Sequence, residues 1–329
     1  MKILLTGSAG YIGSCLYEAI KNKYEIYGVD KVKPKIKKQK RFFLLNLLDK
    51  KRTDALIKFI KPDLIIHLAG QSTIDFIKKQ NEYKKNNIKI TNNLLDIIKT
   101  NNIKHLVFSS TAAVYKVSNK TLNEKSFLSP NNIYGKTKLQ CEREIKKKLN
   151  KSITNFIIFR FFNVCSAMYE HRIGEFHEPE THLIPIIAEK LRSNKKFFIY
   201  GNNFKTTDKT CIRDYIHIKD IVDAFQKSIK YLKLNNQSRI INLGTNKGFS
   251  TLTIFQKFIK LYKENYSYPV PVYKKRRKGD ISKLICDNKK SYRILKWKPK
   301  NSTISKIIRD EVNWLKYIYK KKYKRTTIY

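Results

Sequence analysis

The sequence predicts a Rossmann-like α/β fold, a doubly wound parallel sheet with a smaller C-terminal α/β portion. Three observations support this prediction. Short apolar runs alternate with segments of helical period, which is typical of strand–helix–strand units in a parallel sheet. The apolar runs lack a strict polar–apolar alternation, as expected for strands covered on both faces. A glycine-rich turn at residues 7–13 joins the first apolar run to the first helical segment.

The expected elements follow one another regularly up to about residue 165. Apolar runs predict strands at 2–6, 25–30, 63–68, 104–110 and 154–160. Helical periodicity predicts helices at 12–22, 50–60, 86–100 and 134–149, with a basic loop at 31–41. Later helices are expected at 182–192, 219–232, 251–263 and 303–319, among short strands. We therefore expect one large domain, residues 1–165, and a second portion, residues 166–329, whose elements interleave with it.

The composition indicates a globular protein. Hydrophobic residues make up 41% of the 329 residues, which is enough for a sizeable core. No stretch of about 18 uncharged apolar residues occurs, so no membrane-spanning helix is expected. The first apolar run is too short for the core of a secretory signal. Because the five cysteines are far apart and form no Cys-x-x-Cys pair, we expect reduced thiols in a cytoplasmic protein.

The formal net charge of +44 raises an alternative, a basic non-enzymatic protein that binds nucleic acid or an anionic membrane on a Rossmann scaffold. Lys supplies 57 of the 70 basic residues, whereas Arg, the better partner for phosphates and bases, supplies 13. Asn (27) and Tyr (20) are also frequent, and Ala (9) is rare. A genome biased toward A/T-rich codons explains these shifts together. We therefore predict a Lys-rich surface without nucleic-acid or membrane partners.

The glycine-rich turn has the spacing of a phosphate-binding loop. Gly7 permits the tight turn, Gly10 lets the backbone approach a pyrophosphate, and Gly13 allows the helix to pack closely on the strand. The N-terminus of the following helix favours negative charge. Asp30 ends the second strand, 17 residues beyond Gly13, where an acid accepts hydrogen bonds from an adenosine ribose and repels a 2′-phosphate. This arrangement predicts NAD rather than NADP as cofactor.

Further segments carry a resemblance to a known family. They are HLAG (67–70), EYKKNN (82–87), FSSTAAVY (108–115), IYGKTK (133–138), RFFNV (160–164), PETHLIP (179–185), RDYIHIKD (213–220), NLG (242–244) and RRKGD (276–280). With the Thr-Gly-x-x-Gly-x-x-Gly spacing of the turn, the chain resembles the extended short-chain dehydrogenase/reductase superfamily and, within it, the UDP-glucose 4-epimerase (UDP-galactose 4-epimerase) family. The resemblance implies that residues 1–165 bind NAD and residues 166–329 mainly bind the nucleotide sugar. It also implies a homodimer that pairs two helices per subunit.

The superfamily's Tyr-x-x-x-Lys motif occurs six times in this Lys-rich chain, so placement decides which copy matters. Tyr134 and Lys138 open a helix one loop after a predicted strand, and one helical turn puts them on the same face. Thr111 stands at the carboxyl end of that strand, where open α/β sheets bind their substrates. The resemblance implies Tyr134 as base, Lys138 as cofactor ligand and tuner of the Tyr134 pKa, and Thr111 as partner of a sugar oxygen. We expect the ammonium and NAD⁺ to lower the pKa of Tyr134.

The resemblance also implies two sets of ligand contacts. The NAD contacts are Gly7, Gly10, Tyr11, Ile12, Gly13, Asp30, Asn46, Leu47, Leu68, Ala69, Gly70, Asn87, Ser109, Tyr134, Lys138 and Phe162. The UDP-sugar contacts are Thr111, Tyr134, Asn163, His182, Leu183, Tyr200, Arg213, Arg277, Asp280 and Leu284. In this set Arg213 and Arg277 would clamp the diphosphate, and Leu284 would face the substituent on the sugar C2.

The residues after Thr111 favour one reaction type. They are Ala112 and Ala113, whereas related dehydratases and decarboxylases place acidic side chains there. We therefore predict reversible 4-epimerisation of UDP-glucose and UDP-galactose through a 4-keto sugar, with epimerisation of UDP-N-acetylhexosamines or UDP-uronates as the alternative. The His and Glu spacing over 171–182 would also permit a metal site. Because the resemblance assigns this stretch to a substrate loop, no metal is predicted.

Overall fold

The computed structural model describes residues 1–35, 37–71, 80–177, 180–262, 270–277 and 279–324. Its centre is a seven-stranded sheet in the order β13-β6-β5-β4-β1-β2-β3, with every neighbouring pair parallel. The strands are β1 (Lys2–Thr6), β2 (Glu25–Asp30), β3 (Phe42–Leu44), β4 (Leu64–His67), β5 (His105–Thr111), β6 (Asn155–Phe161) and β13 (Arg239–Leu243). The strand order reverses between β1 and β4, which is the point where doubly wound folds bind their ligands. The predicted fold class is confirmed.

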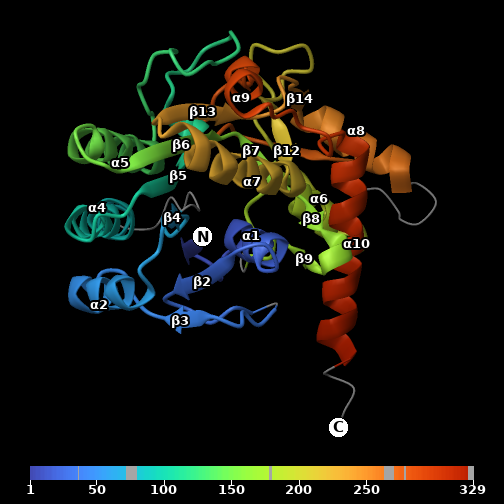
Figure 1. The fold of residues 1–329 in the computed structure, drawn as a ribbon. Helices are drawn as coiled ribbons and strands as arrows, with labels where there is room; N and C mark the ends of the chain where they lie inside the picture. The colour runs from blue at the N-terminus through green and yellow to red at the C-terminus, as the bar shows by residue number, and fades with distance from the viewer. Residues whose placement is uncertain (36, 72–79, 178–179, 263–269, 278, 325–329) are drawn as a thin grey trace.

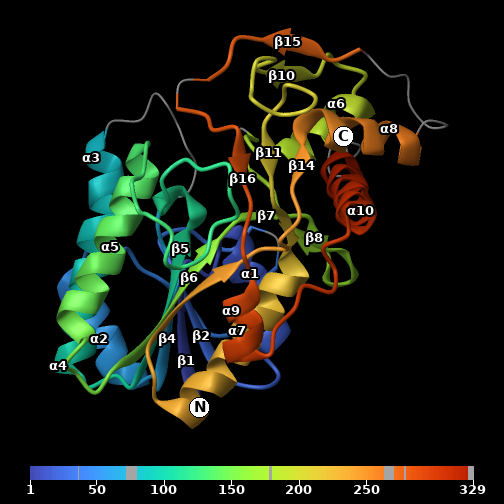
Figure 2. The ribbon, with the colours of Figure 1, turned by 90° about the horizontal axis from the view of Figure 1, so that it is seen from above.

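Helices cover both faces of this sheet (Figure 1; Figure 2). On one face lie α2 (Lys50–Ile60), α4 (Ile90–Thr100) and α5 (Ile133–Leu149), and on the other lie α1 (Tyr11–Ile20), α7 (Ile218–Asn235) and α9 (Lys289–Leu295). Both β4 and β5 are buried along their whole length. This burial explains why their sequences are apolar without alternation.

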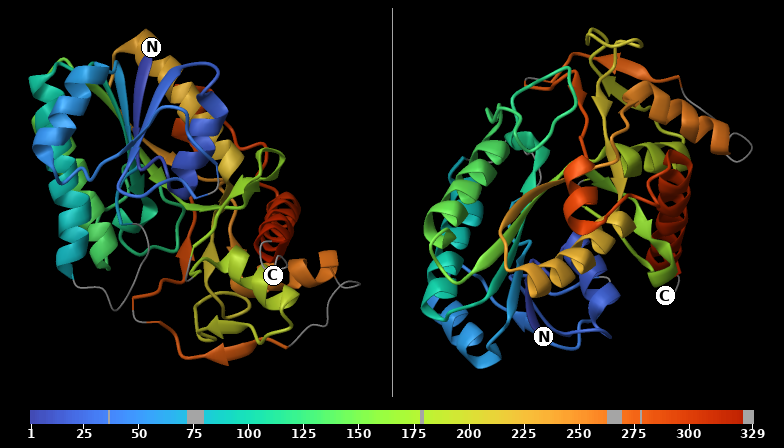
Figure 3. Two further views of the ribbon diagram at one scale, coloured as in Figure 1. Left: turned by 90° about the horizontal axis from the view of Figure 1, so that it is seen from below. Right: turned by 45° about the horizontal axis from the view of Figure 1, so that its top comes forward.

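A second portion of the chain begins beyond the carboxyl end of β6 (Figure 3). Its short strands pair as β7 (Asn163–Cys165) with β12 (Tyr215–His217), β8 (Ala167–Met168) with β9 (Ile173–Gly174), β10 (Phe198–Tyr200) with β15 (Val272–Lys274), and β11 (Ile212–Arg213) between β14 (Phe249–Ser250) and β16 (Lys283–Leu284). Three helices, α6 (Leu183–Arg192), α8 (Thr251–Tyr262) and α10 (Ile304–Lys324), pack around a separate apolar core that includes the fully buried Trp314. Although they follow the start of this portion in sequence, α7 and β13 belong to the large domain. The strand β13 completes the large sheet, and α7 packs against one face of it.

One predicted helix starts earlier than expected and is not α-helical throughout. The helix expected over 86–100 begins earlier, as α3 (Gln80–Tyr83), and passes through a π-helical segment, η1 (Lys84–Lys89), before α4. Apolar periodicity does not reveal a π-helical segment, because the extra residue shifts the pattern by less than half a turn. Such segments are frequent at functional sites, and this one carries Asn87. Short 3₁₀ turns also occur at η2 (Ala112–Val114) and η3 (Tyr169–His171).

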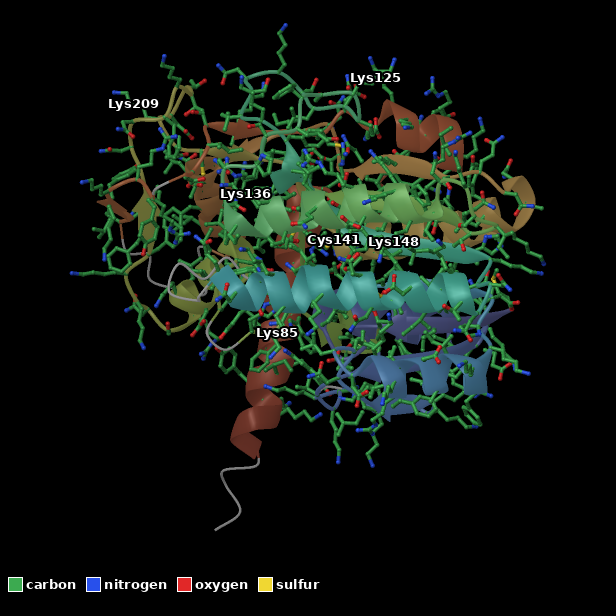
Figure 4. The ribbon with its side chains drawn as sticks, turned by 90° about the vertical axis from the view of Figure 1, so that its left-hand side faces the viewer. Lys85, Lys125, Lys136, Cys141, Lys148 and Lys209 are labelled. Carbon is green, nitrogen blue, oxygen red and sulfur yellow. The ribbon has the colours of Figure 1, made fainter. Side chains whose placement is uncertain are left out.

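Surface features agree with the composition. Lys side chains project from the face drawn in Figure 4, among them Lys85, Lys136 and Lys148 around α4 and α5. The five cysteines are free thiols, four of them buried, as predicted. Within the described part of the chain, no helix has the length and apolar character needed to cross a membrane.

Candidate active site

The turn between β1 and α1 forms a close-packed glycine cradle. Gly7 has a φ of +70°, and a Cβ there would lie 2.6 Å from the Ala69 backbone nitrogen. A Cβ on Gly13 would lie 2.1 Å from the Gly7 carbonyl oxygen. Neither position accepts a side chain without moving the backbone. Gly10 is the N-cap residue of α1, so no side chain caps the positive end of this helix, which can therefore face an anion.

Asp30 lies beside this cradle at the end of β2. Its Oδ2 accepts a hydrogen bond from the Ala9 backbone nitrogen at 3.1 Å. The parallel pairing of β1 with β2 sets Thr6 opposite Val29, which brings the carboxylate to the turn. Burial raises the pKa of Asp30. A carboxylate at this place fits a ribose diol and disfavours a 2′-phosphate.

Other predicted cofactor contacts follow the carboxyl ends of neighbouring strands. They are the exposed Asn46 and buried Leu47 after β3, Leu68, Ala69 and Gly70 after β4, Ser109 in β5, and the buried Phe162 after β6. The Leu68 nitrogen donates to the Thr6 carbonyl oxygen at 3.1 Å, and Ser109 Oγ donates to the His67 carbonyl oxygen at 3.2 Å. These hydrogen bonds hold the carboxyl ends of the strands together at one edge of the sheet. Together with the glycine cradle, that edge fits a dinucleotide.

The predicted catalytic side chains meet where β5 ends and α5 begins. The hydroxyl groups of Thr111 and Tyr134 are hydrogen-bonded. A Cβ on Gly135 would lie 2.3 Å from a backbone carbonyl oxygen of the segment after β5, so this glycine permits the close approach. Asn132 caps α5 by accepting a hydrogen bond from the Gly135 nitrogen at 2.8 Å. The helix therefore starts at the point where its tyrosine reaches the strand end.

Burial is the main cause of the pKa shifts of Tyr134 and Lys138. It raises the pKa of Tyr134 to about 12, although the hydrogen bond with Thr111 acts in the opposite direction. It lowers the pKa of Lys138, whose exposed fraction is 5%, to about 8. The expected lowering of the Tyr134 pKa is therefore not produced by the chain's own residues. The reason is that desolvation of the phenolate outweighs the hydrogen bond with Thr111.

Lys138 lies between an aromatic ring and the π-helical segment. Its Nζ lies 4.6 Å from the centroid of the Phe108 ring. A Cβ added to Gly70 would lie 3.7 Å from Lys138 Nζ and 2.8 Å from Asn87 Oδ1. Asn87 Oδ1 accepts a hydrogen bond from the Gln71 nitrogen at 2.7 Å. The π-helical segment thus brings Asn87, a predicted cofactor contact, close to Lys138.

The predicted diphosphate and ribose contacts lie on the second portion. Arg213 forms an ion pair with Asp280, and its Nη1 donates to the Ile281 carbonyl oxygen at 2.8 Å. The Arg277 guanidinium carbon lies 3.9 Å from the centroid of the Tyr200 ring. Each arginine therefore has a partner within the chain. These contacts orient the two guanidinium groups, whose planar donors suit a diphosphate.

Two contacts connect this side to the predicted catalytic residues. Asn131, just before α5, donates its Nδ2 to the Gly279 carbonyl oxygen at 2.7 Å. Leu284 packs in one apolar cluster with Ala112 and Phe162. The arginine segment therefore lies next to the strand end that carries Thr111.

The remaining predicted substrate contacts have other partners. Asn163 Nδ2 donates to the Asp214 carbonyl oxygen at 3.1 Å. His182 is the N-cap residue of α6, and Leu183 is its first residue. The His182 ring forms an ion pair with Glu175, a contact that the sequence analysis does not predict. Contacts among the loop's own side chains therefore help to fix its conformation, together with its connection to α6.

Comparisons with known proteins agree with this geometry. Residues 3–244 match the NAD dependent epimerase/dehydratase family. The chain is 32% identical over 324 residues to the UDP-glucose 4-epimerase of Lactobacillus helveticus, covering 96% of this chain and 97% of that one. It is 34% identical to the UDP-glucose 4-epimerase of Streptococcus mutans over 326 residues, 95% and 96% of the two chains. The chain belongs to the UDP-glucose 4-epimerase family.

Solved structures show the same fold. The UDP-glucose 4-epimerase of Stenotrophomonas maltophila, with bound NAD and formylated UDP-arabinopyranose, superposes with a TM-score of 0.90 at 27% identity, covering 98% of this chain and 99% of that one. The UDP-Glc/GlcNAc 4-epimerase of Campylobacter jejuni superposes with a TM-score of 0.79 at 31% identity, covering 96% and 99%. The first of these structures holds both a dinucleotide and a UDP-sugar.

A buried ion pair, which the sequence pattern does not predict, lies behind the predicted catalytic residues of this epimerase-family chain. Arg160 Nη2 lies 2.6 Å from Glu142 Oε2, and both side chains are buried. Ser110 Oγ donates to Glu142 Oε1. Ser110 lies on β5, Glu142 on α5 and Arg160 on β6, so these contacts fix the three elements relative to one another. Ser110 directly precedes Thr111, and Glu142 lies one helical turn after Lys138. An arginine inside an otherwise apolar strand was the available sequence signal.

Proposed function

We propose that this protein interconverts UDP-glucose and UDP-galactose by reversible epimerisation at C4, with NAD as the bound redox cofactor. One observation carries the proposal. The hydroxyl groups of Thr111 and Tyr134 are hydrogen-bonded at the carboxyl end of β5, with Lys138 one turn along α5. The glycine cradle and Asp30 support the cofactor, and the family relatives support the substrate.

The chain's own residues provide binding and proton transfer. When bound, NAD⁺ would supply a reversible hydride acceptor for the sugar C4. Tyr134 Oη takes the proton of the sugar 4-hydroxyl, and Thr111 Oγ1 holds the same sugar oxygen in place. Lys138 stabilises the phenolate form by its positive charge. On the return step Tyr134 donates the proton back, so a single acid/base group serves both directions.

The surroundings of Thr111 disfavour elimination and decarboxylation. Ala112 and Ala113 follow it, and neither side chain can act as a second acid or base. The nearby buried carboxylate, Glu142, is occupied by Arg160. Epimerisation needs no second group of this kind, because one proton leaves and returns at the same oxygen.

Product analysis tests the proposal. Purified protein is incubated with UDP-galactose, with UDP-N-acetylgalactosamine and with a UDP-uronate, and the products are identified by chromatography and NMR. We expect UDP-glucose from the first substrate. Conversion of only the second or third would replace the proposal by the corresponding alternative. Conversion of none, by protein shown to carry NAD, would contradict the whole assignment.

Asp30 should determine which dinucleotide the protein carries. Nucleotide released by denaturation should be NAD rather than NADP when identified by mass. Asp30→Ala should weaken NAD binding roughly 10–100-fold, because a hydrogen bond to a charged group contributes about 1.5–3 kcal/mol. Recovery of mainly NADP from the unmodified protein would refute this role.

Leu284 should limit the size of the sugar C2 substituent. Its place in β16, in the apolar cluster next to Ala112, supports this proposal. We expect Leu284→Tyr to lower kcat/KM for UDP-N-acetylgalactosamine relative to UDP-galactose by roughly 10–200-fold, the usual effect of a few heavy atoms in a pocket. If the tyrosine variant handles the N-acetyl sugar as well as the unmodified protein does, another residue forms the wall.

We further propose a homodimer that pairs two helices of each subunit, one of them α5, which carries Tyr134. The outer side of α4 and α5 carries many lysines (Figure 4), and the chain has a formal charge of +44. Like-charge repulsion should therefore oppose association at low ionic strength and be screened by salt. Sedimentation equilibrium should show the dimer fraction rising with NaCl concentration. A monomer at every salt concentration would contradict the proposal.

A further inference from the structure

The loop between β9 and α6 gathers four potential metal ligands. We call these side chains the loop cluster; they are Glu175, His177, Glu180 and His182. One ligand atom from each lies within 4.8 Å of all the others. The spacing Glu-x-His-x-x-Glu-x-His places all four within eight residues. Two imidazoles with two carboxylates form a donor set that suits Zn²⁺ better than Mg²⁺ or Ca²⁺, which prefer oxygen ligands only.

The ligand atoms of the loop cluster lie close enough together to surround one ion. His177 Nδ1 lies 3.3 Å from a Glu175 oxygen and 3.6 Å from a Glu180 oxygen. His182 Nδ1 lies 3.6 Å from the other Glu180 oxygen and forms a closer contact with Glu175. Zn²⁺ binds nitrogen and oxygen at about 2.0–2.1 Å, so the ligand atoms of a tetrahedral site lie about 3.3–3.4 Å apart. The three separations of 3.3–3.6 Å are close to those tetrahedral edges, whereas the Glu175–His182 contact is shorter, so the His182 ring must move away from Glu175 when an ion binds.

Glu175 supplies an independent indication. Its side chain is 1% exposed, and its carboxylate forms ion pairs only with His177 and His182 of the cluster; among the described residues neither oxygen accepts a hydrogen bond of good geometry. His177 Nδ1 is in the same position. A buried carboxylate without hydrogen bonds is costly, so such a group normally has a bound partner. The Glu175 backbone is held in place, because its carbonyl oxygen accepts a hydrogen bond from Trp314 Nε1 at 2.7 Å.

The other members allow an ion to enter and leave. The His177 and His182 side chains are 33% and 47% exposed, so the cluster has a buried base and an open rim. Glu180 Oε1 already accepts hydrogen bonds from the Thr181 and His182 nitrogens, which leaves Oε2 for an ion. The two carboxylate charges equal the charge of one divalent cation.

We propose that the loop cluster binds one structural Zn²⁺ ion, with one ligand atom from each of its four side chains. The ion would join the two ends of the loop and fix the residues where α6 begins. If His182 and Leu183 contact the nucleotide, as the proposed function implies, the ion also orders part of the substrate site. The competing explanation is that protonated imidazoles form plain ion pairs with the carboxylates and no metal binds.

Metal analysis of untagged protein tests the proposal. Protein from zinc-supplemented cultures is dialysed against metal-free buffer, and its zinc content is measured by inductively coupled plasma mass spectrometry. We expect about one zinc per chain in the unmodified protein. We expect the same in the control His171→Ala, which removes an exposed histidine of the neighbouring turn η3. His177→Ala should lose most of the zinc.

A second variant separates the metal from ion pairing. His177→Lys keeps a positive charge beside the carboxylates but removes the imidazole ligand, and it should bind little zinc while remaining folded by circular dichroism. Zinc added to chelator-treated protein should raise Tm in the unmodified protein and not in His177→Lys. Equal zinc content in His177→Lys and unmodified protein, or no zinc uptake by folded unmodified protein, would overturn the proposal.

The consequence for substrate binding is measured separately. Removal of zinc with a chelator should weaken UDP binding several-fold by calorimetry. Zinc content that responds as expected, with UDP binding unchanged, would leave the metal site in place and remove its link to the proposed function.

Discussion

Tyr134→Phe should lower kcat for UDP-galactose by roughly 10²–10⁴-fold, the usual loss when a general acid/base is removed. The substitution deletes only the hydroxyl that is hydrogen-bonded to Thr111 at the end of β5. The fold should survive, because the ring remains and one lost hydrogen bond costs about 1 kcal/mol. Bound NAD should also remain, since the glycine cradle and Asp30 are untouched. A coupled assay for UDP-glucose, with NAD content measured on the same protein, checks both parts.

Tyr292→Phe is a matched control for this experiment. Tyr292 also begins a Tyr-x-x-x-Lys match, but it lies on α9 and is 48% exposed. Its substitution should leave turnover within about twofold of normal. Near-normal turnover in the Tyr134 variant would remove that residue from the mechanism, whereas a large loss in the control would show that the motif was assigned to the wrong helix.

Arg160→Met should destabilise the protein by about 3–5 kcal/mol, because it leaves the Glu142 carboxylate buried without its counter-charge. The double variant Arg160→Met/Glu142→Leu should recover most of this loss, since apolar side chains replace both charges. Urea unfolding of the unmodified, single and double variants measures the free energies. A double variant no more stable than the single one would show that the network stabilises the fold mainly through its other hydrogen bonds.

An exposed ion pair provides the comparison for this series. Lys58 and Asp54 lie one turn apart on α2, with Lys58 Nζ 2.7 Å from Asp54 Oδ2 and side chains 60% and 28% exposed. Lys58→Met should change stability much less than Arg160→Met does, because water already solvates both charges. A similar loss in this variant and in Arg160→Met would contradict the view that burial makes the Glu142 pair important.

Local sequence patterns were sufficient for most of the framework. The runs that became β1, β4 and β5 are apolar because both faces of the sheet are covered, and this property is visible without a structure. The glycine cradle can also be recognised from the sequence, since only glycine tolerates the close backbone contacts of Gly7 and Gly13. Placement relative to those elements was enough to select Tyr134 and Lys138 among six motif matches, although their roles stay predictions until the variants are measured.

Other features depend on residues that only folding brings together. Glu142 and Arg160 lie on α5 and β6, and no periodicity connects a charge on a helix with a charge on a strand. The π-helical segment that carries Asn87 leaves no mark in the apolar pattern. The ion pair of Arg213 with Asp280 joins residues 67 positions apart. Such contacts follow from packing, which the sequence determines only through the whole fold.

The sequence by itself determined the fold class, the cofactor turn and the family, because these depend on local periodicity, on glycine sterics and on motif order. The tertiary structure decided the electrostatics of the site. Burial moves the pKa of Tyr134 up to about 12 and that of Lys138 down to about 8, against the direction expected for the tyrosine from its charged neighbour alone. It also decided which side chains of the loop before α6 converge. The pKa shifts depend on how completely each group loses water, and elements distant in the chain set both this loss of water and the conformation of the loop.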